Sequence, residues 1–308
     1  MTKYIIKRLI RSIPVILIVS IVVYLMVDLL PGDPTLHMFS GQYITADTIA
    51  KARETLGLDQ PVYVRYWKWF SGVLQGDFGE SIVSKRSVIM MIGSVFPRTI
   101  ELTFAAMLVT AVVGISAGVL AAIYQNSWID TVVMFFTSLG VAMPLFWVGL
   151  LALLFFSVQL HWFPVASTGN DLKSLILPAL VLGFSSACLV ARLTRSSVLQ
   201  VLREDYVTTA RSKGLRGQRV IGIHVLRNAF IPILTVLGIQ TGWLLGGAVI
   251  IETVFARPGL GKLSVEAINQ MDFPVLQAIV LFAAILYVFI NLLVDIMNAM
   301  LDPRIRYD

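Results

Sequence analysis

The five residues from Gly114 to Gly118 read Gly-Ile-Ser-Ala-Gly, the G-x-S-x-G pattern with which hydrolases present a nucleophilic serine. That chemistry requires a sharp turn between a strand and a helix, but here the pattern lies inside a long apolar run. The same residues also form G-x-x-x-G, whose small side chains let two membrane helices approach closely. We therefore expect helix packing rather than an intramembrane hydrolase, and the same packing at Gly242 and Gly246.

Residues 257–263, Arg-Pro-Gly-Leu-Gly-Lys-Leu, resemble a phosphate-binding loop but lack two of its required positions. The first glycine of G-x-x-x-x-G-K-[ST] is Ala256 here, and Leu263 replaces the Ser or Thr that would hold magnesium. We expect no ATP binding through this loop. If ATP drives the protein, ATP and magnesium are bound by another subunit.

Metal and cofactor chemistry finds little support in the residue types that would carry it. The three histidines, His37, His161 and His224, stand far apart, and Cys188 is the single cysteine. No disulfide or thiolate cluster can form within the chain, and no histidine has partners at ligand spacing. We expect no metal site and no cofactor.

The composition indicates a membrane protein. Of the 308 residues, 57% are hydrophobic and 14% are charged, and the mean hydropathy is +0.83, which is too apolar for an ordinary soluble domain. The net charge of +6 more often records membrane orientation than nucleic-acid binding when basic residues flank apolar spans. We therefore expect contact with lipid and none with nucleic acid.

Six apolar segments are long enough to cross a hydrocarbon core of about 30 Å, so we predict an all-α polytopic protein with six transmembrane helices. The first segment lacks a signal-peptide cleavage site before Pro31 and is interpreted as a retained anchor. The third is overlong and is expected to tilt or break at Pro144. The segments lie near residues 9–30, 100–123, 131–160, 175–195, 230–252 and 274–300.

Fourteen of the 24 Lys and Arg residues fall on one side of this predicted topology, which places both termini in the cytoplasm. Residues 31–98 then form an outer loop with helices of its own. Thr45 can cap one helix that ends at Gly57, and Pro61 can open another that runs to about Leu74. The aromatic residues of the second helix indicate an anchor at the membrane interface or a wall of a pathway mouth.

Polar residues inside the predicted spans are candidates for function because hydrocarbon penalises them. Asn291, Asp295 and Asn298 share one face of the sixth helix, and Glu252 lies near the outer end of the fifth. Interhelical hydrogen bonds and the lining of a translocation pathway are both compatible with these positions.

A polar and basic loop, residues 196–231, separates the fourth and fifth spans. We expect a short helix over residues 204–213 that ends at Gly214 in a conformation few other residues accept. With Ala210 four residues earlier, and His224, Arg227, Asn228 and Pro232 behind it, the loop resembles the EAA loop of ABC importer permeases.

Other segments resemble the same family in family order, in the form used by its dipeptide, oligopeptide, nickel and glutathione group. They include Leu-Pro-Gly-Asp-Pro at 30–34, Gly-Asp-Phe-Gly-Glu-Ser at 76–81, Glu-Thr-Val-Phe-Ala-Arg-Pro-Gly-Leu-Gly at 252–261 and Asp-Pro-Arg-Ile-Arg-Tyr at 302–307. The Glu-Ala-Ala positions themselves are held by Thr208, Thr209 and Ala210, so no role is carried over to a glutamate there.

The resemblance implies a MetI-like type I importer permease, the first of two paralogous subunits, in a bacterial cytoplasmic membrane. Its domains would be residues 1–30, the outer loop 31–98 and a permease core 99–308. Its partners would be a second permease, two ATPase subunits and an extracytoplasmic substrate-binding protein. The ATPase-coupling residues would be Glu204, Asp205, Tyr206, Thr209, Ala210, Lys213, Gly214, His224, Arg227 and Asn228.

The resemblance leaves the substrate open. We expect a subunit that transports di- or oligopeptides and is not itself an enzyme, with glutathione or nickel chelates as the alternative. An ion-coupled secondary transporter is the alternative from another class, but it predicts inverted repeats, which the sequence does not display.

Overall fold

The computed structural model describes residues 2–29, 59–166 and 171–301. Helices make up nearly all of the described chain, and the pairing of Glu80 with Ser87 is an isolated β-bridge. This agrees with the all-α class expected from the long apolar runs. The helices are α1 (Thr2–Leu29), α4 (Val62–Leu74), α5 (Val88–Ile123), α6 (Trp128–Ala142), α7 (Leu145–Ala152), the π-helical turn η1 (Leu153–Gln159), α8 (Lys173–Leu202), α9 (Asp205–Ser212), α10 (Gly217–Arg219), the π-helical turn η2 (Val220–Val225), α11 (Leu226–Val254), α12 (Leu260–Asn269) and α13 (Phe273–Leu301).

Among the described residues, five stretches of helix are long and apolar enough to cross a membrane, and a bent pair of helices would make a sixth span. The five are Ile6–Met26, Val88–Ile123, Lys173–Leu202, Val220–Val254 and Phe273–Ile296. They correspond to five of the six segments predicted from the sequence. The bent pair corresponds to the third predicted span.

The break in that third span lies at Met143 and Pro144. Helix α6 ends at Ala142 and α7 begins after Pro144, and the two directions differ by 107°. Proline has no N–H to donate and disfavours helical geometry in the residue before it, which explains the position of the break. The overlong segment is therefore two short helices rather than one tilted helix.

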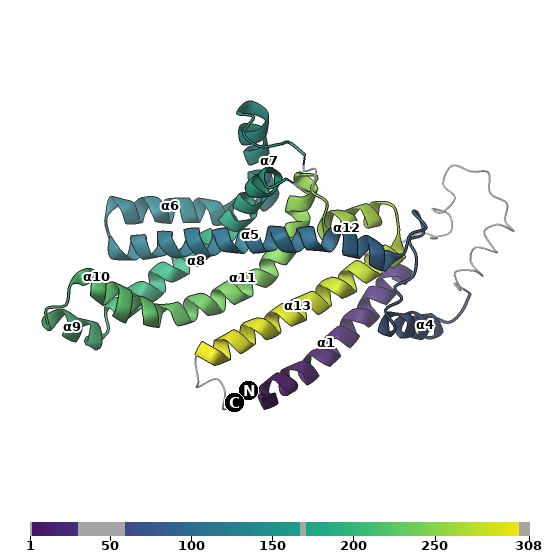
Figure 1. The fold of residues 1–308 in the computed structure, drawn as a ribbon, viewed down its shortest axis with the longest axis horizontal. Helices are drawn as coiled ribbons and strands as arrows, with labels where there is room; N and C mark the ends of the chain where they lie inside the picture. The colour runs from purple at the N-terminus through teal and green to yellow at the C-terminus, as the bar shows by residue number, and fades with distance from the viewer. Residues whose placement is uncertain (1, 30–58, 167–170, 302–308) are drawn as a thin grey trace. The chain divides into compact units, whose positions relative to one another are not determined.

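The described residues form two compact units, and the first consists of residues 98–166, 171–261 and 290–301. Helix α8 lies at its centre and packs against α6, α7 and α11 (Figure 1). The core of this unit includes Leu102 of α5, Leu182 of α8, and Leu244 and Ile251 of α11, all fully buried. Burial on several sides explains why α8 is the most enclosed of the candidate spans.

Small residues set the distance between α5 and α8. A β-carbon on Gly114 would lie 2.9 Å from the carbonyl oxygen of Ala187, and one on Gly118 would lie 2.4 Å from that of Ala191. Gly183 makes the reciprocal approach, because its β-carbon would lie 2.6 Å from the carbonyl oxygen of Ala106. Backbones can come this close only where no side chain intervenes.

Among the described residues, no atom lies within 4 Å of a β-carbon built on Gly246 of α11. The neighbouring Gly247 faces inward, 2.9 Å from Leu182 by the same measure, and Gly238 meets Val294 of α13. Close packing at Gly242 and Gly246 therefore stays a prediction, since G-x-x-x-G spacing does not say which face of a helix meets a neighbour.

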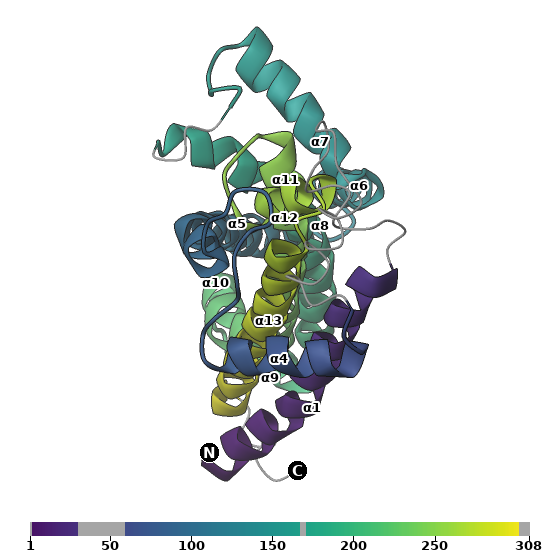
Figure 2. The ribbon, with the colours of Figure 1, turned by 90° about the vertical axis from the view of Figure 1, so that its right-hand side faces the viewer.

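Of the described residues, 2–29, 59–97 and 262–289 form the second compact unit. Helix α4 follows Pro61, as predicted, and lies against α1; Figure 2 shows the two helices crossing. The hydroxyl groups of Ser20 and Tyr66 lie 2.9 Å apart. The other predicted loop helix, Thr45 to Gly57, and the segments at 30–34 and 302–307 lie outside the described residues.

The Gly-Asp-Phe-Gly-Glu-Ser segment forms a tight turn in this second unit. Gly76 and Gly79 have φ values of +83° and +77°, which glycine adopts without strain. The hydroxyl of Ser81 donates a short hydrogen bond to the carboxylate of Asp272, which also accepts from the N–H of Ile82 at 3.1 Å. The motif therefore fastens the start of α5 to the segment before α13.

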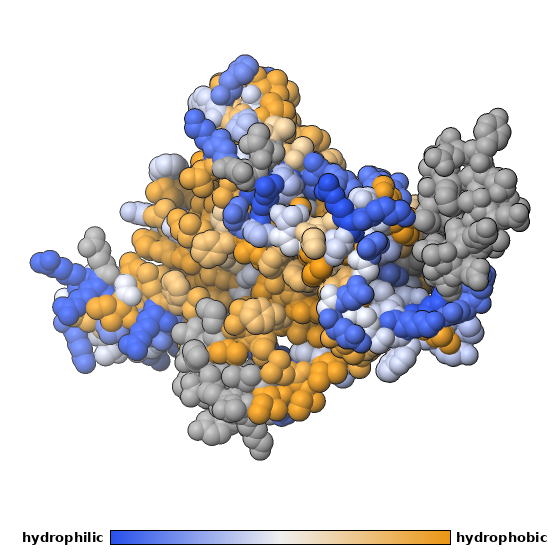
Figure 3. All heavy atoms as spheres, turned by 45° about the vertical axis from the view of Figure 1, so that its right-hand side comes forward, coloured by the Kyte–Doolittle hydropathy of each residue, from blue (hydrophilic) through white to orange (hydrophobic). Residues whose placement is uncertain are grey.

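Many large apolar side chains are exposed, as expected of helices that face lipid or other membrane subunits. Figure 3 shows broad hydrophobic areas interrupted by clusters of hydrophilic residues.

Candidate functional site

The polar loop after α8 forms a short helix with one exposed face. Helix α9 covers Asp205–Ser212, close to the predicted 204–213, and follows Glu204, whose backbone is extended. Asp205 in its first turn and Arg211 in its last turn complement the helix dipole. The side chains of Asp205, Thr208, Thr209 and Ser212 are exposed, so the helix presents a polar surface to its surroundings.

The opposite face of α9 is apolar and buried. Val207 is completely buried and Ala210 is 7% exposed. They belong to an apolar cluster with Val220 and Val225 of η2 and with the ends of α5, α8 and α11. Ala210, expected among the contact residues for an ATPase, therefore supports α9 from beneath and is not part of its exposed face.

Gly214 ends this helix in the left-handed conformation that the sequence predicts, with φ +79°. Its N–H donates to the carbonyl oxygen of Arg211 at 2.9 Å, and the N–H of Leu215 donates to that of Ala210 at 3.4 Å. These two bonds form a Schellman motif, and Leu215 packs on the cluster that contains Ala210. The end of α9 is thus fixed by backbone hydrogen bonds and by an apolar contact.

A side-chain bridge connects α9 to the start of α11. The amide nitrogen of Asn228 donates to the hydroxyl of Tyr206 at 2.8 Å and to the carbonyl oxygen of His224 at 3.1 Å. The structure thus brings together three of the predicted coupling residues, which are up to 22 positions apart. Lys213 and Arg227 are exposed on the same loop.

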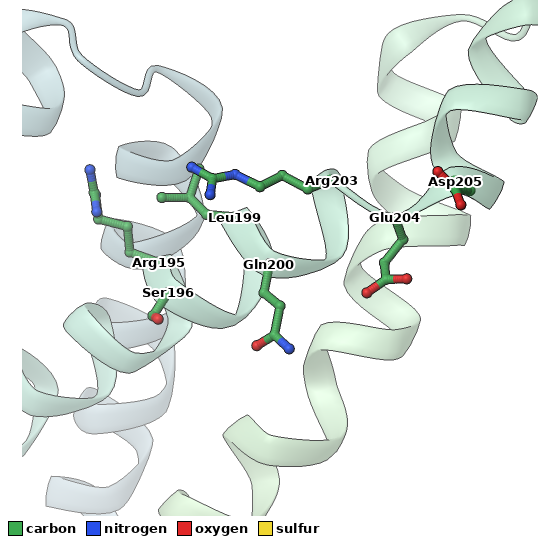
Figure 4. A pocket seen from close by; sticks show the side chains of 7 residues that line it. All are labelled: Arg195, Ser196, Leu199, Gln200, Arg203, Glu204 and Asp205. Atoms are coloured by element: carbon green, nitrogen blue, oxygen red, sulfur yellow. The ribbon is translucent and has the colours of Figure 1, made fainter.

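An open hollow of about 510 Å³ lies where α8 passes into α9 (Figure 4). Arg195, Ser196, Leu199, Gln200 and Arg203 of α8 line it together with Glu204 and Asp205. Figure 4 shows the side chain of Arg203 lying back along α8, while those of Gln200 and Glu204 point to the other side. The hollow therefore has a mixed charge next to the exposed face of α9.

One strong ion pair at this end of α8 escaped the sequence analysis. Nε and Nη2 of Arg195 each donate to a different carboxylate oxygen of Asp130 at 2.7 Å. Asp130 lies in the first turn of α6, capped by Ser127, and also accepts from the N–H of Asn126. The two residues are 65 positions apart. One lies just before the third predicted span and the other at the end of the fourth, so nothing local in the sequence indicates that they pair.

Of the two roles left open for Glu252, the structure shows the contacts that interhelical hydrogen bonding would make. The residue is completely buried. One carboxylate oxygen accepts from the hydroxyl of Thr99 at 2.6 Å and the other from the N–H of Gly261 at 2.7 Å. Both oxygens of the buried carboxylate therefore have hydrogen-bond donors within the protein, and a role in the pathway stays a prediction.

The same contacts explain the lookalike phosphate loop. The carboxylate of Glu252, a residue of α11, lies at the start of α12, where a bound phosphate would lie in a true phosphate loop. The N–H of Leu260 donates to the hydroxyl oxygen of Thr99 at 2.8 Å. A β-carbon on Gly259 would lie 2.1 Å from the carboxyl carbon of Glu252. The glycines thus make room for the protein's own carboxylate.

Arg257 is buried beside this carboxylate and donates to Glu101 at 3.1 Å. Burial lowers the pKa of its guanidinium, and the nearby Glu101 and Glu252 carboxylates oppose that shift. The remaining nitrogens, Nε and Nη1, are buried without a hydrogen-bond partner among the described residues. The hydrogen bond to Glu101 and the negative charge of the nearby carboxylates therefore offset the cost of burying the Arg257 guanidinium.

The predicted polar stripe lies on α13, where Asn291 and Asp295 are half-buried. The side chain of Asn298 lies outside the described part of the chain. A role for these residues in a pathway stays a prediction. Among the described residues, no group of three or more His, Cys, Asp or Glu is placed to hold a metal ion.

The fold and the loop agree with one class of protein, a multi-pass inner-membrane permease. Residues 114–307 match the family described as binding-protein-dependent transport system inner membrane component, and residues 1–103 match its N-terminal region. The chain belongs to this family. It is a permease subunit of an ABC importer and not itself an ATPase.

Curated relatives match the chain from end to end. The glutathione transport system permease proteins GsiC of Salmonella typhi and Escherichia coli K12 are 44% and 43% identical over 307 residues, with each chain covered completely. In the solved structures, the chain is similar to an amino acid ABC transporter (TM-score 0.56, 18% identity, 69% of this chain and 94% of that one). It is also similar to the MetNI methionine ABC transporter (TM-score 0.57, 16% identity, 70% and 97%). These likenesses confirm the MetI-like fold.

Proposed function

We propose that α9 is the element through which this permease contacts an ATPase subunit. The observation that carries the proposal is the two-sided construction of α9, whose polar face is exposed while Val207 and Ala210 fix the other face in an apolar cluster. A helix held in this way moves with α8 and α11 as one body. Closure of two ATPases against it would shift those helices and open the permease to alternate sides.

The transported substrate is, in this proposal, glutathione or a similar short peptide. From the sequence alone we predict di- or oligopeptides, with glutathione or nickel chelates as the alternative. The full-length relatives at 43–44% identity are named as glutathione permeases, which favours that alternative. Glutathione is itself a tripeptide, so the two proposals differ in the specificity within one chemical class.

The complete importer would contain a paralogous second permease, two ATPase subunits and a substrate-binding protein on the outer side. In this arrangement both termini of the chain and α9 lie in the cytoplasm, and residues 31–98 lie outside. Half of the pathway would come from this chain, with Asn291, Asp295 and Asn298 as candidate lining residues.

The test is ATP hydrolysis and substrate uptake by the complex reconstituted in proteoliposomes, with its own binding protein present. Reduced glutathione should stimulate hydrolysis severalfold, whereas a dipeptide and a nickel chelate should not. If only the dipeptide stimulates hydrolysis, the transported substrate is a dipeptide or oligopeptide rather than glutathione. Hydrolysis that no ligand stimulates, together with normal uptake, would contradict ATPase coupling through this subunit.

The family membership decides against the ion-coupled secondary transporter that was the alternative from another class. The two classes differ in their energy source, so uptake into vesicles should require ATP and should not be driven by a proton gradient alone.

A further inference from the structure

Helix α4 has three distinct faces, which follow from its sequence and a rotation of about 100° per residue. Tyr66, Trp69 and Val73 lie on one face. Tyr63, Trp67, Phe70 and Leu74 lie within an arc of roughly 60° on a second face, about a quarter turn away. Arg65, Lys68 and Gly72 lie on the third face.

The first face packs on α1. The rings of Tyr66 and Trp69 lie 5.6 and 5.4 Å from that of Tyr24, and the hydroxyl of Tyr66 meets that of Ser20. Aromatic pairs at this separation prefer the edge-on and tilted orientations found here. The contact fixes both the position of α4 along α1 and its rotation about its own axis.

That contact also sets the depth of α4 in the membrane. The apolar span of α1 ends at Met26. Tyr24 and Ser20 precede Met26 by two and six residues, which correspond to roughly 3 and 9 Å along a helix. Amphipathic helices at a membrane surface lie about 5–10 Å deep, at the boundary between headgroups and acyl chains.

The second face of α4 is apolar, and Phe70 on it is half-buried while its other three residues are exposed. The side chains of Tyr63, Trp67 and Leu74 are 74%, 67% and 72% exposed. Tyrosine and tryptophan are enriched at this boundary because a ring buries its apolar body while its polar atom reaches water. On the third face, Lys68 Nζ is bonded to the side chain of Gln60 at 2.8 Å and is exposed.

We propose that α4 lies flat in the lipid–water interface on the outer side of the cytoplasmic membrane, and that it binds lipid through Tyr63, Trp67 and Leu74. Its Tyr66 and Trp69 face holds it against α1, while its Lys68 face is in water. Helix α4 is thus a lateral brace for the first span. The observations favour lipid over a protein partner because the exposed stripe lies a quarter turn from α1, at the depth that α1 itself defines.

The experiment measures collision of nitroxide labels with oxygen and with a water-soluble nickel complex. The full importer is placed in nanodiscs, with Cys188→Ala to remove the native thiol. Trp67→Cys and Tyr63→Cys place a label on the lipid face, and Lys68→Cys is the matched control on the polar face. A second lipid-face position protects the result against local disturbance by either substitution.

At positions 63 and 67, we expect oxygen accessibility severalfold above that of nickel, and the reverse at position 68. Nickel accessibility at all three positions would overturn the proposal and place α4 in water. Labels at 63 and 67 that are inaccessible to both reagents would also overturn it and identify a protein partner on this face.

Discussion

The guanidinium of Arg195 on α8 holds both carboxylate oxygens of Asp130 on α6, with two hydrogen bonds of 2.7 Å. The side chain of Asp130 is 8% exposed and that of Arg195 is 24% exposed, so water competes little for the pair. A two-point bond fixes orientation as well as distance. It ties the first turn of α6 to the helix that leads into α9.

Asp130→Asn should therefore destabilise the protein, because the neutral amide cannot accept both guanidinium hydrogen bonds. We expect a loss of about 1.5–3 kcal/mol, the range for hydrogen bonds that involve a charged group. The measurement is the temperature at which the detergent-solubilised complex loses its monodisperse peak. Glu266→Gln is the control, since it removes only an exposed pair of 3.8 Å with Lys262. An equal decrease of this temperature in the two variants would contradict a specific stabilising role for the Asp130–Arg195 pair.

Gly214→Val should strain the end of α9. A β-branched residue at φ +79° costs about 1–3 kcal/mol, although no atom lies within 4 Å of the added β-carbon. The variant should remain in the membrane but retain less ATPase on co-purification, or hydrolyse ATP without uptake. Gly214→Asn should be much milder because asparagine tolerates this conformation. Equal co-purification and uptake in wild type and Gly214→Val would show that this turn is not needed for coupling.

Thr209→Asp and Ala210→Asp should distinguish residues of α9 that contact the ATPase from residues that hold α9 in place. Thr209 is exposed on α9, so a charge there should weaken ATPase attachment while leaving thermal stability near that of wild type. Ala210 is buried, so the same charge should open the apolar cluster and lower stability by several kcal/mol unless the carboxylate takes up a proton. Thermal stability and ATPase co-purification, measured together, distinguish the two. Unchanged attachment in Thr209→Asp would remove the exposed face from the proposed docking site.

Glu252→Ala should be strongly destabilising, because Thr99, Gly261 and Arg257 lose a buried carboxylate at once. We expect about 3 kcal/mol or more. Gly261→Ala should act through the same site, since its β-carbon would lie 2.3 Å from the backbone of Val249. Glu266→Gln is the comparison, because its pair with Lys262 is partly exposed, 3.8 Å long and worth about 0–1 kcal/mol. A stable Glu252→Ala variant with altered uptake would support the pathway role.

The helices themselves could be predicted from sequence because the bilayer imposes their length. Runs of apolar residues located the spans, Pro144 marked the break and Pro61 marked the start of α4. Gly214 was recognisable because a polar helix that ends in glycine has few other geometries. Each of these signals is local in the chain.

The tertiary contacts could not be predicted in the same way. The sequence places Glu252 in a span but does not show that Thr99, 153 positions away, satisfies it. Nothing in the sequence connects Asp130 with Arg195, which are 65 positions apart. The sequence also does not show that Ala210 is buried rather than exposed on α9. At Gly246, the spacing was informative about small residues but not about which side of α11 meets a neighbour.

The break at Pro144 has a consequence for how the chain enters the membrane. Helix α6 has 15 residues and is roughly 22 Å long, shorter than a hydrocarbon core of about 30 Å. By itself, a helix of this length does not cross the core. Its contacts on α8, at Arg195 and Cys188, come from residues more than 45 positions later in the chain. We therefore expect a chain that ends before α8 to insert α6 poorly.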